Sequence, residues 1–276
     1  MNRPQLSDAR NNTNRFDGFA DLYDSARPAC PQFVIDILPR YLNRHPETVV
    51  DIGCGTGLST LIWAGTADRI IGIEPNEDMI TRALDNGRHF RNIEFIRAFS
   101  DHTGLCSGIA DIITCSQSFH WMEPESTMRE INRLLKPGGV FAAYDCDWPP
   151  VCGTDVELAY KVLFRRVAEI EENLSDRATY FRYPKHKHLD SLLKFGGFCY
   201  IREIVFANTE NFNAERFFDI ALSQGGIQDI LKKDPSLMEK ELAAFHKTVD
   251  KFFGSQTLPI EFCYRMRMGV NKRIND

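Results

Sequence analysis

The sequence predicts an α/β protein with a doubly wound, mostly parallel sheet and a helical cap. In the first half of the chain, short apolar runs alternate with amphipathic helical patterns. Parallel strands need such crossovers, because helices must cover both faces of the sheet. After residue 145 the alternation stops and longer helical stripes follow. With 276 residues, 43% of them hydrophobic, the chain can bury one large core and an accessory layer.

Two helices are expected before the first strand. Apolar residues over 16–23 have helical spacing, and Pro28 ends the pattern. A second apolar face runs over 33–42, where Pro39 predicts a kink or an early end. The alternating region then predicts a strand at 49–52, a helix at 58–66, a strand at 70–74, a helix at 77–87, strands at 93–97 and 110–115, a helix at 125–135 and a strand at 140–145.

The second half is expected to be mainly helical. The capping-box sequence Thr154–Glu157 starts a helix, and its apolar stripe continues to about residue 174. The remaining patterns predict a helix at 187–195, a strand at 200–207, a helical insertion from 213 to about 253, and a last strand that alternates over 260–268.

A glycine-rich turn follows the first predicted strand. The segment Val49–Leu58 reads VVDIGCGTGL, and Glu74 closes the next apolar run. A dinucleotide site needs a glycine where Leu58 stands, and a Walker loop needs Gly-Lys-Ser or Gly-Lys-Thr, which does not follow here. The acid before the glycines favours a ligand with an amine, and Glu74 can accept hydrogen bonds from two ribose hydroxyls. The turn therefore indicates a nucleoside cofactor.

The turn and Glu74 resemble motif I and its partner in the class I S-adenosylmethionine-dependent methyltransferases. Residues 16–28 (FDGFADLYDSARP) are similar to the amino-terminal segment of the type 11 group. Residues 116–121 (SQSFHW) resemble the trans-aconitate methyltransferase-like branch, and residues 134–139 (LLKPGG) resemble the turn before the fifth strand. The resemblance implies a Rossmann-like, seven-stranded methyltransferase sheet with an antiparallel last strand, and S-adenosyl-L-methionine as the cofactor.

The same resemblance implies how the chain is organised. Residues 1–147 would form the cofactor-binding core with an amino-terminal lid, and 148–182 and 209–256 would form the helical substrate cap. Residues 183–208 and 257–276 would supply the final helix and strands that complete the sheet. The order and spacing of the motifs bear on fold and cofactor, and they say little about the methyl acceptor.

The resemblance also implies roles for residues around the cofactor. Asp51 would organise the glycine turn and contact the ammonium group directly or through water, and Glu74 would hold the ribose. Met79 would pack on the adenine or form plain helix core. Many relatives have an acid or serine followed by alanine after the third strand, but counting without gaps places Phe99 and Ser100 there, so the usual acid is absent. The full set of predicted cofactor-binding residues is Tyr23, Arg27, Asp51, Gly53, Gly55, Gly57, Glu74, Met79, Phe99, Ser100 and Ser116.

A second group of residues is expected near the methyl acceptor. His120 is the candidate general base, because its charge changes near neutral pH, although a structural histidine tied to the backbone fits the position equally. Gln117, Trp121 and Trp148 are predicted to contact the substrate. Arg27 belongs to the amino-terminal lid and can reach the methionyl carboxylate of the cofactor, with a surface salt bridge as the alternative.

Composition and charge narrow the range of partners. The formal net charge of -5 gives no general attraction to nucleic acid or anionic lipid. The basic segment 182–188 is expected to be a solvated loop rather than a metal or nucleic-acid site. The eight cysteines lack metal-ligand spacing, so we expect no metal and reduced thiols, as in the cytoplasm. The sequence shows neither a leader pattern nor an apolar run of membrane length, so no membrane partner is expected.

The expected function is transfer of a methyl group from S-adenosylmethionine to a small-molecule acceptor, with a carboxylate as one candidate. A carboxylate is ionised at pH 7 and needs no base, so an inert His120 is compatible with catalysis. Three alternatives stay open. They are a methyltransferase acting on tRNA or another macromolecule through 182–188, a non-catalytic cofactor-binding protein, and use of the cofactor for other chemistry such as carboxymethyl transfer. The sequence carries no readable pattern for the acceptor or the oligomeric state.

Overall fold

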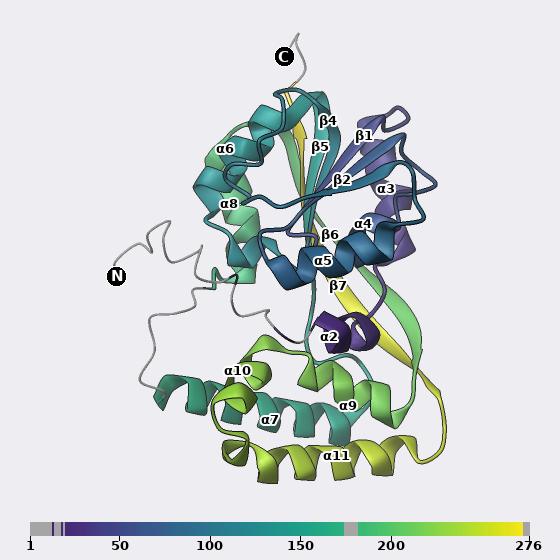
Figure 1. Cartoon of the computed structure of the whole chain (residues 1–276), viewed down its shortest axis with the longest axis vertical. Helices are drawn as coiled ribbons and strands as arrows, with labels where there is room; N and C mark the ends of the chain where they lie inside the picture. Colours follow the sequence, from purple (N-terminus) through teal and green to yellow (C-terminus); the bar gives the residue numbers. More distant parts are fainter. Residues whose placement is uncertain (1–12, 14–17, 19, 174–181, 273–276) are drawn as a thin grey trace.

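The computed structural model describes residues 13, 18, 20–173 and 182–272. Its core is a seven-stranded sheet with the strand order β3-β2-β1-β4-β5-β7-β6 (Figure 1). Neighbouring strands are parallel except at β7, which runs antiparallel to both β5 and β6. The predicted doubly wound, mostly parallel sheet with an antiparallel last strand is confirmed. The strands are β1 (Thr48–Ile52), β2 (Arg69–Ile73), β3 (Ile93–Ile96), β4 (Ala110–Ser116), β5 (Leu135–Cys146), β6 (Phe198–Phe212) and β7 (Leu258–Asn271).

Alternate residues of the central strands pack on opposite faces of the sheet. Val49 of β1 belongs to a hydrophobic cluster with Leu38 of α3 (Gln32–Leu42). Val50 belongs to a second cluster, to which α6 (Pro124–Leu134) contributes. Because both faces are covered, β1 is buried along its whole length, which explains its continuous apolar run. The other helices around the sheet are α2 (Ala20–Ala26), α4 (Leu58–Leu61), α5 (Glu77–Gly87) and α8 (His188–Phe195), with the short 3-10 helices η2 (Phe119–Trp121) and η3 (Lys185–Lys187).

A layer of helices lies beyond one end of the core (Figure 1). Aromatic side chains join these helices to each other. Tyr160 packs against Phe245 with 6.0 Å between ring centroids, and Phe217 packs against Phe253 at 5.4 Å. We call this layer the cap; it consists of α7 (Thr154–Asn173), α9 (Ala214–Leu222), α10 (Gly225–Lys233), η4 (Pro235–Leu237) and α11 (Glu239–Phe253). The strands β6 and β7 run on from the core sheet and reach it (Figure 1).

Two helix boundaries differ from the prediction. α4 ends at Leu61, short of residue 66. The following amides donate to carbonyls three residues back, as from Trp63 to Thr60 (3.2 Å), so the chain tightens into turns. Pro39 lies inside α3, which continues to Leu42, so the early end expected at this proline is wrong. A proline removes one backbone donor, and the packed face of the helix tolerates this loss.

The strands of the second half are longer than expected. β5 begins at Leu135 instead of residue 140, beside a register shift between Ala110 and Ile112 of β4. β6 has 15 residues and β7 has 14, and they pair over this whole length. Phe212, at the end of β6, is buried in the cluster that the cap shares with the core. The extra length therefore connects the sheet to the cap.

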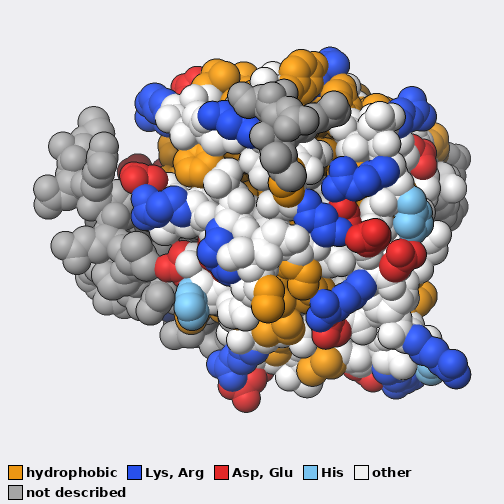
Figure 2. All heavy atoms as spheres, turned by 90° about the horizontal axis from the view of Figure 1, so that it is seen from above, with side chains coloured by type: hydrophobic (Ala, Val, Ile, Leu, Met, Phe, Trp, Pro, Cys, Tyr) orange, Lys and Arg blue, Asp and Glu red, His pale blue; other side chains and the backbone are white. Residues whose placement is uncertain are grey.

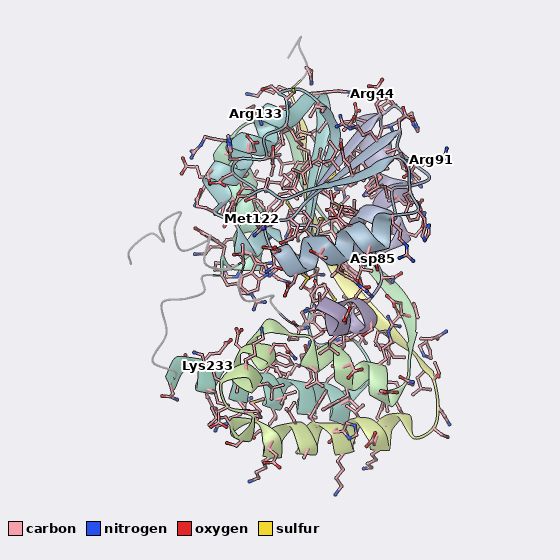
Figure 3. The ribbon with its side chains drawn as sticks, viewed as in Figure 1. Arg44, Asp85, Arg91, Met122, Arg133 and Lys233 are labelled. Atoms are coloured by element: carbon pink, nitrogen blue, oxygen red, sulfur yellow. The ribbon has the colours of Figure 1, made fainter. Side chains whose placement is uncertain are left out.

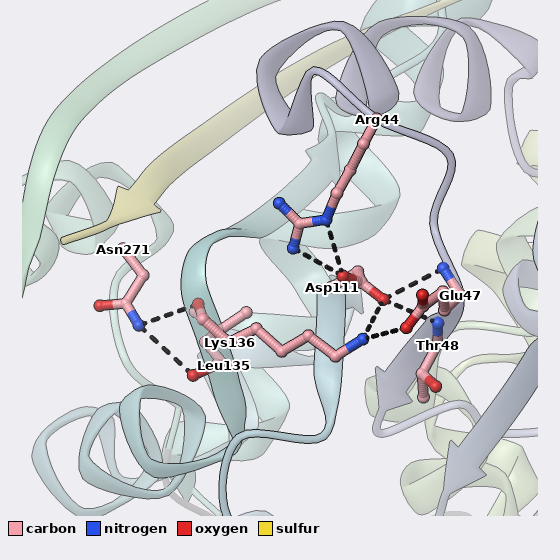
Figure 4. A network of polar contacts seen from close by, with 7 residues as sticks. All are labelled: Arg44, Glu47, Thr48, Asp111, Leu135, Lys136 and Asn271. Carbon is pink, nitrogen blue, oxygen red and sulfur yellow. Dashed lines mark hydrogen bonds and ion pairs between the residues drawn. The ribbon is translucent and has the colours of Figure 1, made fainter. Parts of the chain in front are cut away.

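A buried carboxylate, Asp111, lies at the end of the sheet remote from the cap, and Figure 4 shows its polar contacts. Asp111, at the start of β4, accepts hydrogen bonds from Arg44, from Lys136 and from the amides of Glu47 and Thr48. Burial opposes the ionisation of Asp111, but the Thr48 amide, Lys136 and Arg44 outweigh it and hold its pKa below the usual value. This network ties β1, β4 and β5 together.

Charges of both signs are interspersed over this same end of the molecule, with hydrophobic side chains between them (Figure 2). Close ion pairs there include Lys136 with Glu47, whose nitrogen and oxygen are 2.6 Å apart. Among the helices of the described residues, none combines the length and the apolar character needed to cross a membrane.

Candidate active site

Three glycines with positive φ angles form the turn after β1. The φ angle is 71° at Gly53, 55° at Gly55 and 88° at Gly57. At Gly53, an added Cβ atom would also lie 2.6 Å from the Cβ atom of Ser118. Glycine takes this conformation without strain and leaves the space free. The turn therefore depends on glycine for both its path and its packing.

Asp51 lies beneath the glycine turn and is completely buried. Its Oδ2 accepts hydrogen bonds from the hydroxyls of Ser59 (2.6 Å) and Thr60 (2.8 Å), and its Oδ1 accepts one from Thr114 (2.8 Å). Burial raises the pKa of Asp51, and these three hydroxyls oppose the rise. The carboxylate connects β1, α4 and β4. This position supports the loop-organising part of its predicted role and gives no support to direct contact with a ligand.

Glu74 connects the end of β2 to the glycine turn. Its Oε2 accepts a hydrogen bond from the amide of Gly55, and its Oε1 accepts one from the amide of Asn76, both at 2.9 Å. Burial raises the pKa of Glu74 to about 7, and the two amides oppose the rise. A carboxylate has about four acceptor positions, so about two remain for hydroxyl groups of a ligand.

A cavity lies between the carboxyl ends of the strands and the cap. Most of the predicted site residues line it, and Gln224 and Gly225 of the cap complete its wall. Met122, another wall residue, lies on the cap-facing side of the core, far from Arg44 at the opposite end (Figure 3). The predicted residues in the wall are Tyr23, Arg27, Gly53, Gly55, Glu74, Met79, Phe99, Ser100, Ser116, Gln117, His120, Trp121 and Trp148.

Asp51 and Gly57 are the two predicted cofactor residues that do not line this cavity. An added Cβ atom at Gly57 would lie 3.0 Å from Cζ of Phe95. The absence of a side chain at Gly57 therefore makes room for the Phe95 ring. The predicted close approach of a ligand to Gly57 finds no support in this arrangement.

The cavity wall after β3 contains an acidic residue, Asp101, which the gap-free count along the sequence did not place there. Phe99 and Ser100 line the cavity as expected, and Asp101 lines it next to them. The hydroxyl of Ser100 is 2.9 Å from that of Thr127, so the serine is engaged with α6. Met79 is buried at the start of α5 and lines the cavity. A shift of one residue in the sequence count would have found Asp101.

Arg27 joins the amino-terminal lid to the cap. Its Nη2 donates hydrogen bonds to the carbonyl of Ser223 (3.2 Å) and to Oε1 of Gln224 (3.3 Å). The guanidinium lies 4.6 Å from the ring centroid of Tyr23 and 5.7 Å from that of Trp148. These contacts hold Arg27 in the cavity wall instead of in a surface salt bridge.

The basic segment 182–188 was expected to be a solvated loop, and this is wrong for Lys185 and His188. Lys185 is partly buried and lines the cavity, and His188 is buried at the start of α8. Arg182 also lines the cavity but is exposed, as expected. Lys185 Nζ donates to Oε1 of Gln117 (3.3 Å). The described residues contain no group of histidines, cysteines and acids that could hold a metal. The sequence marks this segment by its cluster of positive charge, but that cluster alone predicts exposure to solvent rather than a place in the cavity wall.

His120 lies in the cavity wall beside a buried carboxylate. Its Nδ1 is 3.2 Å from Oδ1 of Asp145, and both side chains are 3% exposed. Burial lowers the pKa of His120 to about 3, Lys185 and Arg182 add to the effect, and Asp145 opposes it. The ring is therefore uncharged at neutral pH. The sequence predicted that Asp145 ends a strand and did not indicate that it lies beside His120.

Comparison with known proteins bears on this geometry. Residues 50–143 match the family model described as a methyltransferase domain. CRG1 of Saccharomyces cerevisiae, named as an S-adenosylmethionine-dependent methyltransferase, is 27% identical over 124 residues, which cover 44% of this chain and 43% of that protein. The chain thus spans less than half the length of this curated relative.

Solved structures share the fold. A structure from Anaeromyxobacter dehalogenans, described as a type II methyltransferase, has a TM-score of 0.65 at 18% identity and covers 90% of this chain and 99% of its own. Phosphoethanolamine N-methyltransferase 2 of Haemonchus contortus, bound to phosphomonomethylethanolamine and S-adenosylhomocysteine, has a TM-score of 0.55 at 13% identity, with 98% and 61% covered. Residues 50–143 form a class I methyltransferase domain. Its cofactor is S-adenosylmethionine.

The residues of this methyltransferase domain fit that cofactor. Glu74 keeps acceptor positions for the two ribose hydroxyls. The apolar side chains of Met79 and Phe99 in the wall suit a flat adenine ring. Gly53 and Gly55 line the cavity without side chains, and an added Cβ atom at Gly55 would meet no atom within 4 Å. These groups would hold the cofactor between β1 and β3.

Proposed function

We propose that this chain transfers the methyl group of S-adenosylmethionine to a small-molecule acceptor bound between the methyltransferase domain and the cap. The main support for the proposal is the cavity. Its wall includes both the glycine turn with Glu74 and the cap residues Gln224 and Gly225. A ligand at Glu74 and a second molecule under the cap would share this space. A cap over the strand ends favours a small acceptor rather than a nucleic acid.

Cationic side chains support a carboxylate on the acceptor. Arg182 and Lys185 line the cavity together with Gln117. The guanidinium of Arg182 matches the planar shape of a carboxylate, and the ammonium of Lys185, which already pairs with Asp145 at 3.1 Å, adds one further donor. Arg27, the third cation of the wall, would face the methionyl carboxylate of the cofactor. We therefore propose a small acceptor that carries a carboxylate, in keeping with the resemblance of residues 116–121 to the trans-aconitate methyltransferase-like branch.

The chain would contribute mainly orientation and exclusion of water. When bound, S-adenosylmethionine supplies an electrophilic methyl group on a positively charged sulfur. Ser116 and Gln117 follow β4 in the wall, and Gln117 holds a φ angle of 53°, which turns the chain toward η2. Trp121 and Trp148 add flat apolar surface around the acceptor. Fixing two reactants in line accounts for a large share of the rate of such displacements.

The function is tested with methyl-labelled S-adenosylmethionine and a panel of small carboxylic acids, amines and phenols. We expect S-adenosylhomocysteine release, and transfer of label, with carboxylic acids of the panel. Bulk tRNA is included as the macromolecular acceptor, and label found in the tRNA would replace the small-molecule proposal. Cofactor binding without any release above the acceptor-free control would identify a non-catalytic binding protein instead.

A further inference from the structure

Asp145 occupies the end of β5 and is surrounded by nitrogen atoms. Its Oδ1 lies 3.2 Å from Nδ1 of His120 and 3.1 Å from Nζ of Lys185. Its Oδ2 lies 3.3 Å from Nδ1 of His188 and 3.7 Å from Nη1 of Arg267. Although burial alone would raise the pKa of Asp145, Lys185 and the two histidines hold it well below the usual value. The carboxylate is therefore ionised throughout the neutral range.

This arrangement favours one nitrogen of His120 as the site of the proton. Within the described residues, Nδ1 of His120 and Oδ1 of Asp145 have no well-aligned hydrogen-bond partner, but a carboxylate oxygen cannot donate, and its negative charge 3.2 Å away stabilises a proton on Nδ1. The neutral ring then has its proton on Nδ1 and a lone pair on Nε2. The ring does not need to be charged, because Lys185 already balances Asp145, and Glu203 pairs with Arg267 at 2.8 Å.

The surroundings also hold the ring of His120 in place. Its backbone carbonyl accepts a hydrogen bond from the amide of Tyr183 (2.8 Å). The Trp121 ring lies 4.9 Å from it, and the His188 ring stacks on it at 6.4 Å. The charged and titratable groups that face it or its carboxylate partner are Asp145 of β5, Lys185 of η3, Arg182 ahead of η3, His188 of α8, Arg267 of β7 and, through Arg267, Glu203 of β6.

We propose that Asp145 is a positioning residue that keeps His120 protonated on Nδ1, so that Nε2 accepts a hydrogen bond from an O–H or N–H group of the methyl acceptor. The inference rests on the proposed function of the cavity. It adds that the acceptor carries a protic group at this place, apart from the carboxylate that the cations hold. A bare carboxylate facing Nε2 would meet a lone pair and be repelled.

The tautomer can be read directly from 15N chemical shifts of histidine-labelled protein, with and without S-adenosylhomocysteine. His120→Gln identifies the signal of His120. We expect the Nδ1–H tautomer, uncharged from pH 5 to pH 8. A proton on Nε2 of His120 in the wild-type protein would by itself overturn the proposal. The nitrogen signals of His120 can be measured without ligand. A protein that does not bind the cofactor would therefore still show whether this inference holds.

Asp145→Asn tests the positioning role, and Glu203→Gln is the matched control, since it removes a neighbouring carboxylate without touching His120. In Asp145→Asn we expect a smaller share of the Nδ1–H tautomer. We also expect kcat to fall about 100-fold with an active acceptor of the panel. The Kd for S-adenosylhomocysteine should stay within about twofold, since Asp145 does not line the cavity. Glu203→Gln should change none of these quantities. An unchanged tautomer in Asp145→Asn, or equal losses in both variants, would refute the role.

A second variant covers the case in which Asp145→Asn does not fold. Lys185→Met keeps the carboxylate and removes the ammonium beside it. We expect the Nδ1–H tautomer to persist and the pKa of His120 to rise, because Lys185 contributes to its low value. A switch to the Nε2–H tautomer in Lys185→Met would show that the lysine, not Asp145, controls the ring.

Discussion

Replacing Glu74 by glutamine should make the stability of the protein less dependent on pH. Burial raises the pKa of Glu74 from 4.5 to about 7. Below pH 4.5 the carboxyl is protonated in both the folded and the unfolded chain, so it hardly changes the free energy of unfolding. Above about pH 7 it is ionised in both, and the buried charge lowers the free energy of unfolding by about 3 kcal/mol. The stability is thus lost as the pH rises between these two values.

Urea unfolding of the wild type and of Glu74→Gln from pH 5 to pH 8 measures this effect. All other titrating groups are common to both proteins, so their contributions cancel. The wild type should lose about 2 to 3 kcal/mol more than the variant over this interval. Glu77→Gln is the control, since its side chain is 74% exposed. Parallel curves for the wild type and Glu74→Gln, or an equal effect in Glu77→Gln, would refute burial of the Glu74 charge as the cause.

Two further predictions concern the turn and the remote end of the sheet. Gly53→Ala places a Cβ atom 2.6 Å from Ser118, whereas Gly55→Ala meets no atom within 4 Å. Both have positive φ, so Gly53→Ala should lose about 1 to 3 kcal/mol more in unfolding free energy; equal losses would contradict the packing. Asp111→Asn should cost about 2 to 4 kcal/mol in urea unfolding without changing the Kd for S-adenosylhomocysteine. A weakened Kd would show that this network reaches the cavity.

The part of the cavity assigned to the methyl donor could be located from the sequence because its signals are local. The glycines of the turn follow a buried strand directly, and Glu74 ends the next strand of the same unit. The carboxyl ends of adjacent parallel strands meet at one edge of a sheet, so these groups had to converge. Two details differ from the prediction, because neither Asp51 nor Gly57 lines the cavity. Asp51 is buried against the hydroxyls of Ser59, Thr60 and Thr114, and Gly57, within the turn, makes room for Phe95.

The proposed acceptor side could not be predicted, because tertiary packing brings its residues together. Lys185 and His188 follow the first helix of the cap in the chain, yet both reach Asp145 at the end of β5. A cluster of positive charge is more often solvated than buried, and nothing local to residues 182–188 indicates the carboxylate that holds them. The length of β6 and β7 was missed for the same reason, since the cap supports their far ends.

Isothermal titration of the wild-type protein with S-adenosylhomocysteine tests the central claim most directly. If the cavity above the glycine turn holds the cofactor, the titration should show saturable binding at one site per chain. Glu74→Gln should weaken that binding about 10-fold or more, because hydrogen bonds to a charged carboxylate are lost. Absence of heat at millimolar ligand, or equal affinity in the variant, would contradict the assignment of this cavity to S-adenosylmethionine.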